Sequence, residues 1–130
     1  MKALCKLLLV ALALAALGGC AGTPIPNPFK GMLQSKGEPG LAAGIQNYEN
    51  GNYDEAAKGL QNALDLGLDR SDQVKAHKYL AFIHCASGRE KQCRDEFKKA
   101  LDLDPSLELK PAEAGHPIWG PVFRSVKLHH

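Results

Sequence analysis

The sequence of 130 residues has few aromatic residues and, beyond its first nineteen residues, no excess of charge. Aromatic residues make up 6% of the chain and charged residues 23%, and there is one tryptophan. The first nineteen residues hold Lys2 and Lys6 and no acidic residue, so the remaining 14 of the 16 basic residues balance the 14 acidic ones. A neutral chain without a basic block lacks the charge that nucleic-acid binding requires. We therefore expect no nucleic-acid partner.

The motifs of common enzymes are also absent. The sequence contains no Gly-x-Ser-x-Gly elbow, no phosphate-binding glycine loop and no His-Glu-x-x-His helix. Its carboxylate pairs, such as Asp54 with Glu55, fall at expected helix ends, where capping and solvation are the ordinary roles. We expect no catalytic residue, no cofactor and no small-molecule substrate.

No apolar run is long enough to span a bilayer. Leu7–Leu17 has eleven residues without a polar side chain, whereas a helix needs about 20 residues to cross the apolar core. A short apolar run between a basic start and small residues is typical of a secretory signal peptide. We expect residues 1–19 to be that signal peptide. Residues 20–40 contain four of the eight prolines and are predicted to be a proline-rich tether.

Cys20 follows Leu17, Gly18 and Gly19, an order that resembles the lipobox of bacterial lipoproteins. The resemblance implies cleavage before Cys20, diacylation of its thiol and acylation of the new amino terminus. Anchoring by more than one acyl chain is durable. In such lipoproteins an aspartate after the cysteine favours the inner membrane, and Ala21 stands there instead. This implies the periplasmic face of the outer membrane in a Gram-negative cell. The alternative is an ordinary signal peptide, with Cys20 a chance thiol.

Beyond the tether, the chain repeats itself at an offset of 37 residues. Small residues fall on small residues and large apolar residues on large ones: Gly44 on Ala81, Ala56 on Cys93, Leu60 on Phe97, Ala63 on Ala100 and Leu64 on Leu101. Small residues let two antiparallel helices approach closely. We therefore predict an all-α fold with helical hairpins at about 41–68 and 74–105, in which Gly44 faces Ala56 and Ala81 faces Cys93.

The segments GNYDEAAKGLQNALDL and GREKQCRDEFKKALDLDP closely resemble second helices of tetratricopeptide repeats. The resemblance implies an α-solenoid, in which the first helix of each hairpin lines a concave groove for peptides or helices. The positions that it places on the groove are Leu41, Ile45, Tyr48, Lys75, Lys78 and Phe82. An apolar strip with two lysines suits a partly acidic peptide. The alternative is that Leu41, Ile45 and Phe82 are packed by the tether or by a cap.

Two hairpins are fewer than repeat stacks usually need, because each covers only one face of its neighbour. Residues 106–130, with Trp119 as the only tryptophan, are the candidate capping segment. Pro111 and Pro121 suit the first turns of short helices there. In this interpretation Trp119 and Phe123 are buried on the second hairpin. The alternative is that Trp119 belongs to a docking surface, because Trp and Arg are enriched in binding hot spots.

Cys85 and Cys93 lie on opposite sides of the expected turn at Gly88. An oxidising compartment favours a disulfide between them. Ala81 is the more natural neighbour of Cys93 in the predicted hairpin, so two buried free thiols are the alternative. Zinc sites usually pair ligands two to four residues apart, and thiol-redox sites prefer Cys-x-x-Cys. Neither spacing occurs, so we expect no metal site.

The lipobox, the tether, the repeats, the stretch KYLAFIHCASGREKQCRDEFKKAL and the ending DPSLELKPAEAGHPIWGPVF together resemble the TssQ-like family. These are small tetratricopeptide lipoproteins associated with type VI secretion. The link to secretion rests on the Cys85 to Cys93 spacing and on a signature of Gly115, His116, Pro117, Trp119, Gly120 and Pro121. The resemblance implies a scaffold or accessory factor at the outer membrane that contacts an envelope component of the secretion system. The alternatives are a pilotin-like lipoprotein for a secretin or type IV pilus and an envelope thiol or metal-binding protein.

If Cys85 and Cys93 are bonded, mass spectrometry of the non-reduced mature protein will find the peptide pair two hydrogens lighter than its reduced form. Closing so short a loop stabilises a fold by about 2 to 3 kcal/mol, so reduction is expected to lower the melting temperature. Alkylation of both thiols without a reductant contradicts the pairing.

Overall fold

The computed structural model describes residues 34–130, and all regular structure in that range is helical. The prediction of an all-α fold is confirmed. The helices are α3 (Glu38–Glu49), α4 (Tyr53–Leu66), α5 (Arg70–Ala86), α6 (Glu90–Leu103), α7 (Pro111–Ala114) and α8 (Gly120–Leu128). Within residues 34–130, no helix combines the length and the apolar character needed to cross a membrane. The expected signal peptide, Cys20 and most of the tether lie outside the described residues.

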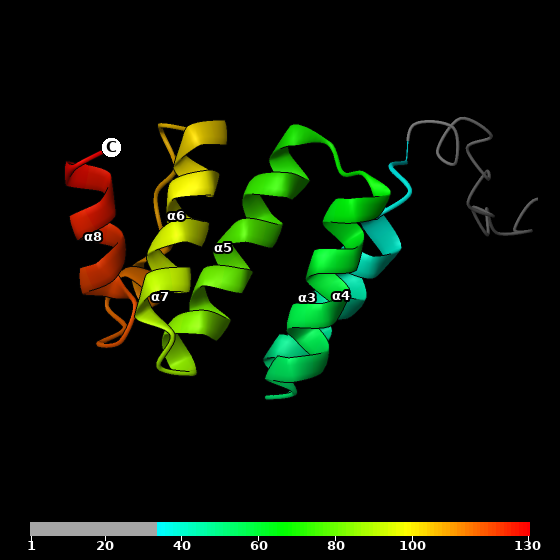
Figure 1. The fold of residues 1–130 in the computed structure, drawn as a ribbon, viewed down its shortest axis with the longest axis horizontal. Helices are drawn as coiled ribbons and strands as arrows, with labels where there is room; N and C mark the ends of the chain where they lie inside the picture. Colours follow the sequence, from blue (N-terminus) through cyan, green and yellow to red (C-terminus); the bar gives the residue numbers. More distant parts are fainter. Residues whose placement is uncertain (1–33) are drawn as a thin grey trace, which may run out of the picture. The chain divides into compact units, whose positions relative to one another are not determined.

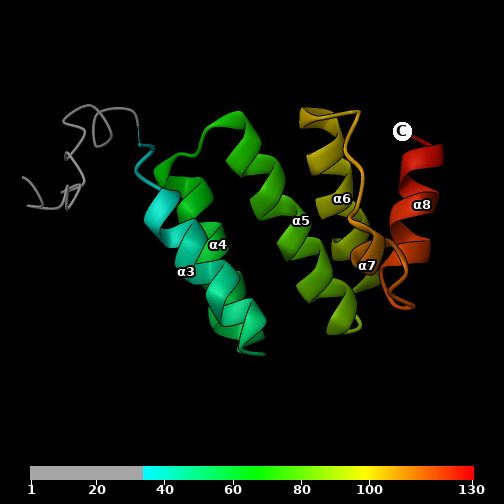
Figure 2. The same ribbon diagram turned by 180° about the vertical axis from the view of Figure 1, so that it is seen from behind.

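Two helical hairpins form the body of the domain (Figure 1). α3 pairs with α4 and α5 with α6, and the view from behind shows the same neighbours (Figure 2). Each hairpin turns at a glycine in the left-handed region, Gly51 with φ of 79° and Gly88 with φ of 72°. A side chain at either position would be strained, because L-residues seldom adopt these angles.

Both first helices begin earlier than the sequence pattern predicts. α3 begins at Glu38 instead of residue 41, because Pro39 fits the first turn of a helix. α5 begins at Arg70 instead of residue 74. Its start is fixed by Asp69, whose carboxylate accepts a hydrogen bond of 2.8 Å from the backbone N–H of Asp72.

The two helices of each hairpin meet one helical turn away from the predicted register. A Cβ atom added to Gly44 would lie 2.8 Å from Cγ of Leu60, so Gly44 packs on Leu60, not on Ala56. In the second hairpin, Cys93 meets Cys85 and not Ala81, with a Cα to Cα distance of 5.1 Å. The same shift in both hairpins follows from their shared repeat pattern.

The C-terminal segment adds an incomplete third hairpin. The chain is extended over 107–110, forms the single turn of α7, and then enters α8, which packs on α6. α8 runs in the same direction as α6 (Figure 1), as the second helix of a further hairpin does. Val122 and Phe123 are buried in a common cluster with Phe97 of α6. α8 therefore covers α6 at this end of the domain.

Replacing Gly44 with alanine is expected to lower the free energy of unfolding by about 1–3 kcal/mol, because the new methyl group would overlap Leu60. Gly40→Ala in the same helix is the matched control. Its Cβ would lie at an ordinary 3.4 Å from Cβ of Ala63, so better helix propensity should stabilise the fold by about 0.5–1 kcal/mol. Urea unfolding followed by circular dichroism measures both changes, and equal effects would refute this helix register.

Candidate protein-binding surface

The six predicted groove positions lie on α3 and α5, the first helices of the two hairpins, and α7 contacts α5 through the ion pair of Lys78 with Glu113. Leu41 and Phe82, which the sequence pattern placed on the groove, are only 3% and 1% exposed. Leu41 lies in the core of the first hairpin, and Phe82 lies beneath the C-terminal segment. Neither side chain is available to a partner, and the reason is packing within the chain. Ile45 and Tyr48 are half-buried, and Lys75 is exposed.

Lys78 is occupied by an internal ion pair. Its Nζ donates to Oε1 of Glu113 in α7 at 2.7 Å, and both side chains are largely buried. The same Nζ lies 5.0 Å from the ring centroid of Tyr79 and 5.6 Å from that of Phe82. The other oxygen of Glu113 accepts the backbone N–H of Lys110 at 3.0 Å. Lys78 therefore fixes α7 to α5, which corrects the expectation that its charge faces an acidic peptide.

Trp119 closes the second hairpin. Its ring stacks on Phe82 with 4.7 Å between centroids, and its indole N–H donates to the backbone oxygen of Glu113 at 3.0 Å. The ring of His116 stacks on its other side at 3.4 Å. With Trp119 8% exposed, the structure favours the capping interpretation over the docking one.

Three tyrosines remain accessible at the junction of the two hairpins, and we call them the tyrosine cluster: Tyr48, Tyr53 and Tyr79. The ring of Tyr48 lies 5.1 Å from Tyr79 and 5.6 Å from Tyr53. Burial, with smaller contributions from Tyr53, Tyr79 and Glu113, raises the pKa of Tyr48 to about 12. Burial also raises the pKa of Tyr79. These phenols therefore stay neutral near neutral pH and can donate hydrogen bonds.

Tyr53 and Tyr79 are surface residues that the sequence pattern did not indicate. The resemblance to tetratricopeptide repeats placed Lys75, Lys78 and Phe82 of α5 on the groove, and Tyr79 follows Lys78 directly. Its contact with Tyr48 joins α5 to α3 across the two hairpins. All three tyrosines of the chain gather here, and their spacing in the sequence does not reveal this grouping.

Cys85 and Cys93 are joined by a disulfide between α5 and α6, with an S–S distance of 2.00 Å. This is the pairing that the compartment argument favours, and it leaves neither sulfur as a free thiol. Among residues 34–130, no group of three or more His, Cys, Asp or Glu side chains is arranged to hold a metal ion.

Comparison with known proteins gives two relatives of limited extent. The chain is 32% identical over 62 residues to the photosystem I assembly protein Ycf3 of Synechococcus sp. strain CC9902, which covers 48% of this chain and 36% of that protein. It is 27% identical over 81 residues to the protein of the same name from strain CC9605, covering 61% and 47%. The chain thus spans less than half the length of these relatives. No family model and no solved structure matches it. The helical hairpins are consistent with a tetratricopeptide-like α-solenoid, and the similarity supports no finer assignment than that.

Truncating the cap residue should separate a structural role from a docking role. Trp119→Ala removes the stack on Phe82, and we expect it to lower the free energy of unfolding by about 3–5 kcal/mol. Ile118→Ala, at the exposed neighbouring position, should change it by no more than about 0.5 kcal/mol. Denaturant unfolding of the two variants checks this. Unchanged unfolding of Trp119→Ala with loss of partner binding would assign Trp119 to a docking surface.

Proposed function

We propose that this chain is an outer-membrane-anchored periplasmic lipoprotein that acts as a protein-interaction scaffold or accessory factor of a type VI secretion system. The observation that supports the binding role is the tyrosine cluster, where Tyr48 and Tyr79 meet across two hairpins and stay partly exposed. Tyrosine gives a large contact area and a polar tip, which is why it is enriched at protein interfaces.

The charge beside the cluster suggests the type of partner. Lys75 is exposed on α5, one turn before Tyr79, and its Nζ contacts Asp72 of the same helix at 2.7 Å. Such a surface ion pair is weak and easily exchanged for another carboxylate. A partner segment with an acidic residue and apolar side chains suits this surface, with Lys75 and the tyrosines as its contacts.

The location and the secretion system are supported by the sequence. The lipobox at Cys20 supplies the anchor, and the proline-rich composition of residues 20–40 favours a tether. A proline-rich chain reaches about 3.1 Å per residue, so the tether holds the domain up to roughly 50 Å from the lipid. The signature at residues 115–121 and the Cys85 to Cys93 spacing support the link to type VI secretion.

Crosslinking in cells, followed by purification of the full chain from envelope membranes, tests this function. We expect type VI membrane-complex or baseplate proteins to be recovered. The Cys20→Ser variant cannot take a lipid at that position. It should be absent from the membrane fraction and should recover few of these proteins. Recovery of secretin or pilus proteins in their place contradicts the proposal and favours the pilotin-like alternative.

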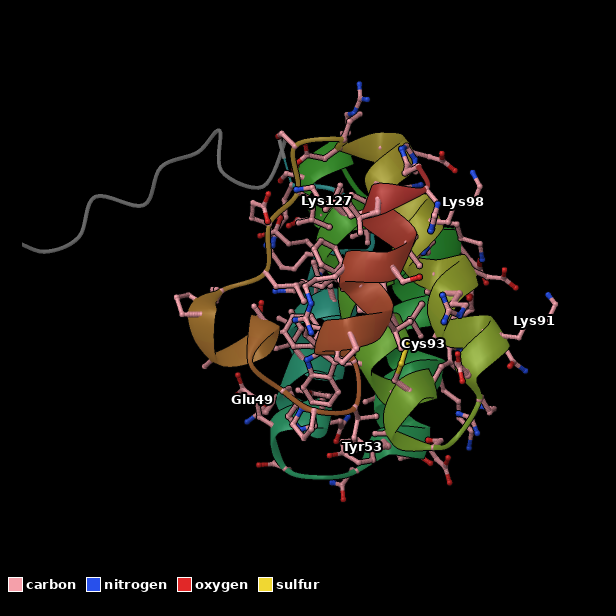
Figure 3. The ribbon with its side chains drawn as sticks, turned by 90° about the vertical axis from the view of Figure 1, so that its left-hand side faces the viewer. Glu49, Tyr53, Lys91, Cys93, Lys98 and Lys127 are labelled. Atoms are coloured by element: carbon pink, nitrogen blue, oxygen red, sulfur yellow. A yellow bond between two sulfur atoms is a disulfide. The ribbon has the colours of Figure 1, made fainter. Side chains whose placement is uncertain are left out.

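A matched pair of lysine variants tests the surface in the same experiment. Lys75→Glu should reduce partner recovery about tenfold, because it places a like charge against an acidic partner. Lys98→Glu is the control, since Lys98 is an exposed lysine of α6 that also pairs with an aspartate on its own helix, Asp102. Figure 3 shows Lys98 on the opposite side of the end view from α7. Equal recovery with both variants contradicts the concave binding surface.

A further inference from the structure

The incomplete third hairpin leaves an open apolar cavity of about 520 Å³ at the C-terminal end of the domain. We call this cavity the end groove. One wall is the chain from Glu108 to Ala114, and the other is α8. Its apolar lining comes from Leu109, Ala114, Gly120, Phe123 and Leu128. Ligand sites of proteins have this range of volume and this apolar character.

The end groove exists because a helix is missing from the third hairpin. In the first two hairpins, long helices face each other and their side chains fill the space between them. In the third, residues 107–110 are extended and α7 has four residues, so few side chains oppose α8. Figure 3 looks onto this end, with α8 in front and α7 beside it. The gap is thus built into the chain.

The place of the groove in the repeat indicates the shape of its occupant. α5 packs on both helices of the hairpin before it, α3 and α4. A helix placed between α8 and the chain from Glu108 to Ala114 would take the corresponding position on the third hairpin. Within residues 34–130 no helix lies there, and Leu128 at its edge is 82% exposed. The groove has the form of a site for one more helix.

The charges at the edge indicate the chemistry of that helix. Nζ of Lys127 contacts the carboxylate of Glu108 and donates to the backbone oxygen of Leu107, so these two charges offset each other (Figure 3 labels Lys127). Arg124 is exposed, and its Nη1 donates to the backbone oxygen of Ala114 at 3.2 Å. Most of the five guanidinium N–H groups are left for an incoming acceptor. Among the charged residues that line the groove, Arg124 is the one without a carboxylate partner, which suits a carboxylate of the incoming helix.

We propose that the end groove binds an amphipathic helix of a protein partner. Its apolar residues, spaced three and four apart, contact the accessible side chains of Leu128 and Ala114, above the buried Phe123 and Leu109, and an acidic residue at its flank pairs with Arg124. This inference rests on the proposed scaffold function and adds a second surface, formed by different elements from the tyrosine cluster.

A defined peptide pair tests this proposal on the full chain carrying Cys20→Ser, which has no acyl chain at that position to compete for the groove. One peptide is an amphipathic helix with leucines on one face and glutamates beside them, and the other has lysines in place of the glutamates. Fluorescence anisotropy should show the glutamate peptide binding at least about tenfold more tightly. Arg124→Glu should reverse this preference.

Leu128→Asp and Leu66→Asp form the matched pair for the apolar contact. Both leucines are exposed, 82% at the groove and 50% at the end of α4, so both variants should keep the melting temperature. We expect Leu128→Asp to lower the affinity for the glutamate peptide about tenfold and Leu66→Asp to leave this affinity unchanged.

Four results would overturn the proposal. Equal affinity of the parent chain for both peptides would show that apolar contacts alone bind them and that Arg124 forms no ion pair with the glutamates. Equal weakening by Leu128→Asp and Leu66→Asp places the peptide elsewhere. A concentration-dependent dimer in sedimentation, lost on Leu128→Asp, makes a second copy of the chain the occupant. Failure of peptide binding while type VI proteins are still recovered from cells removes the end groove and leaves the scaffold function standing.

Discussion

The contact on which the domain depends is the stack of Trp119 on Phe82. Two hairpins alone leave one side of α5 and α6 facing water, and that side carries Phe82 and Phe97. Trp119 covers the first, and Phe123 meets the second with 5.2 Å between ring centroids. The two phenylalanines in turn contact each other at 5.9 Å. An aromatic cluster contributed by three segments thus replaces the next repeat of a longer solenoid.

Closing the core in this way decides where binding can occur. The ion pair of Lys78 with Glu113 and the stack of His116 on Trp119 hold the C-terminal chain over the second hairpin. The accessible aromatic side chains on α3 and α5 therefore lie at the tyrosine cluster, at the junction of the two hairpins. The helix α7 in this C-terminal chain has only four residues and does not fill the space beside α8, which leaves the end groove. Both candidate surfaces therefore follow from the way in which the C-terminal chain closes the core.

The sequence predicted what local pattern determines. The repeat offset identified two hairpins, the glycines marked their turns, and the apolar C-terminal segment was recognised as a cap. The register was predicted one turn away, because Gly44 was matched with Ala56, whereas Gly59 and Leu60 lie against it. The burial of Lys78 was beyond local pattern, since its partner Glu113 lies 35 residues further along the chain. The end groove arises because residues 107–114 form only the short helix α7 in place of a full first helix of the third hairpin, and the sequence pattern did not indicate such a groove.

The signature at residues 115–121 also has a structural explanation. A Cβ atom at Gly120 would lie 2.4 Å from the backbone oxygen of Ala114, so this position requires glycine for α8 to approach α7. With His116 and Trp119 stacked nearby, much of the signature specifies the cap. The features that suggested a secretion role thus also encode the shape that creates the two surfaces.

Native-state amide hydrogen exchange tests most directly whether the cap and the hairpins form one cooperative unit. The N–H of Phe123, which donates to the oxygen of Trp119 at 2.9 Å, reports on the cap, and amides in the middle of α5 report on the hairpins. A shared core predicts that both open with the same free energy, equal to that of global unfolding. Exchange at Phe123 through a much smaller opening free energy, with α5 still protected, would show that the cap is a separate element and contradict its place at the centre of the fold.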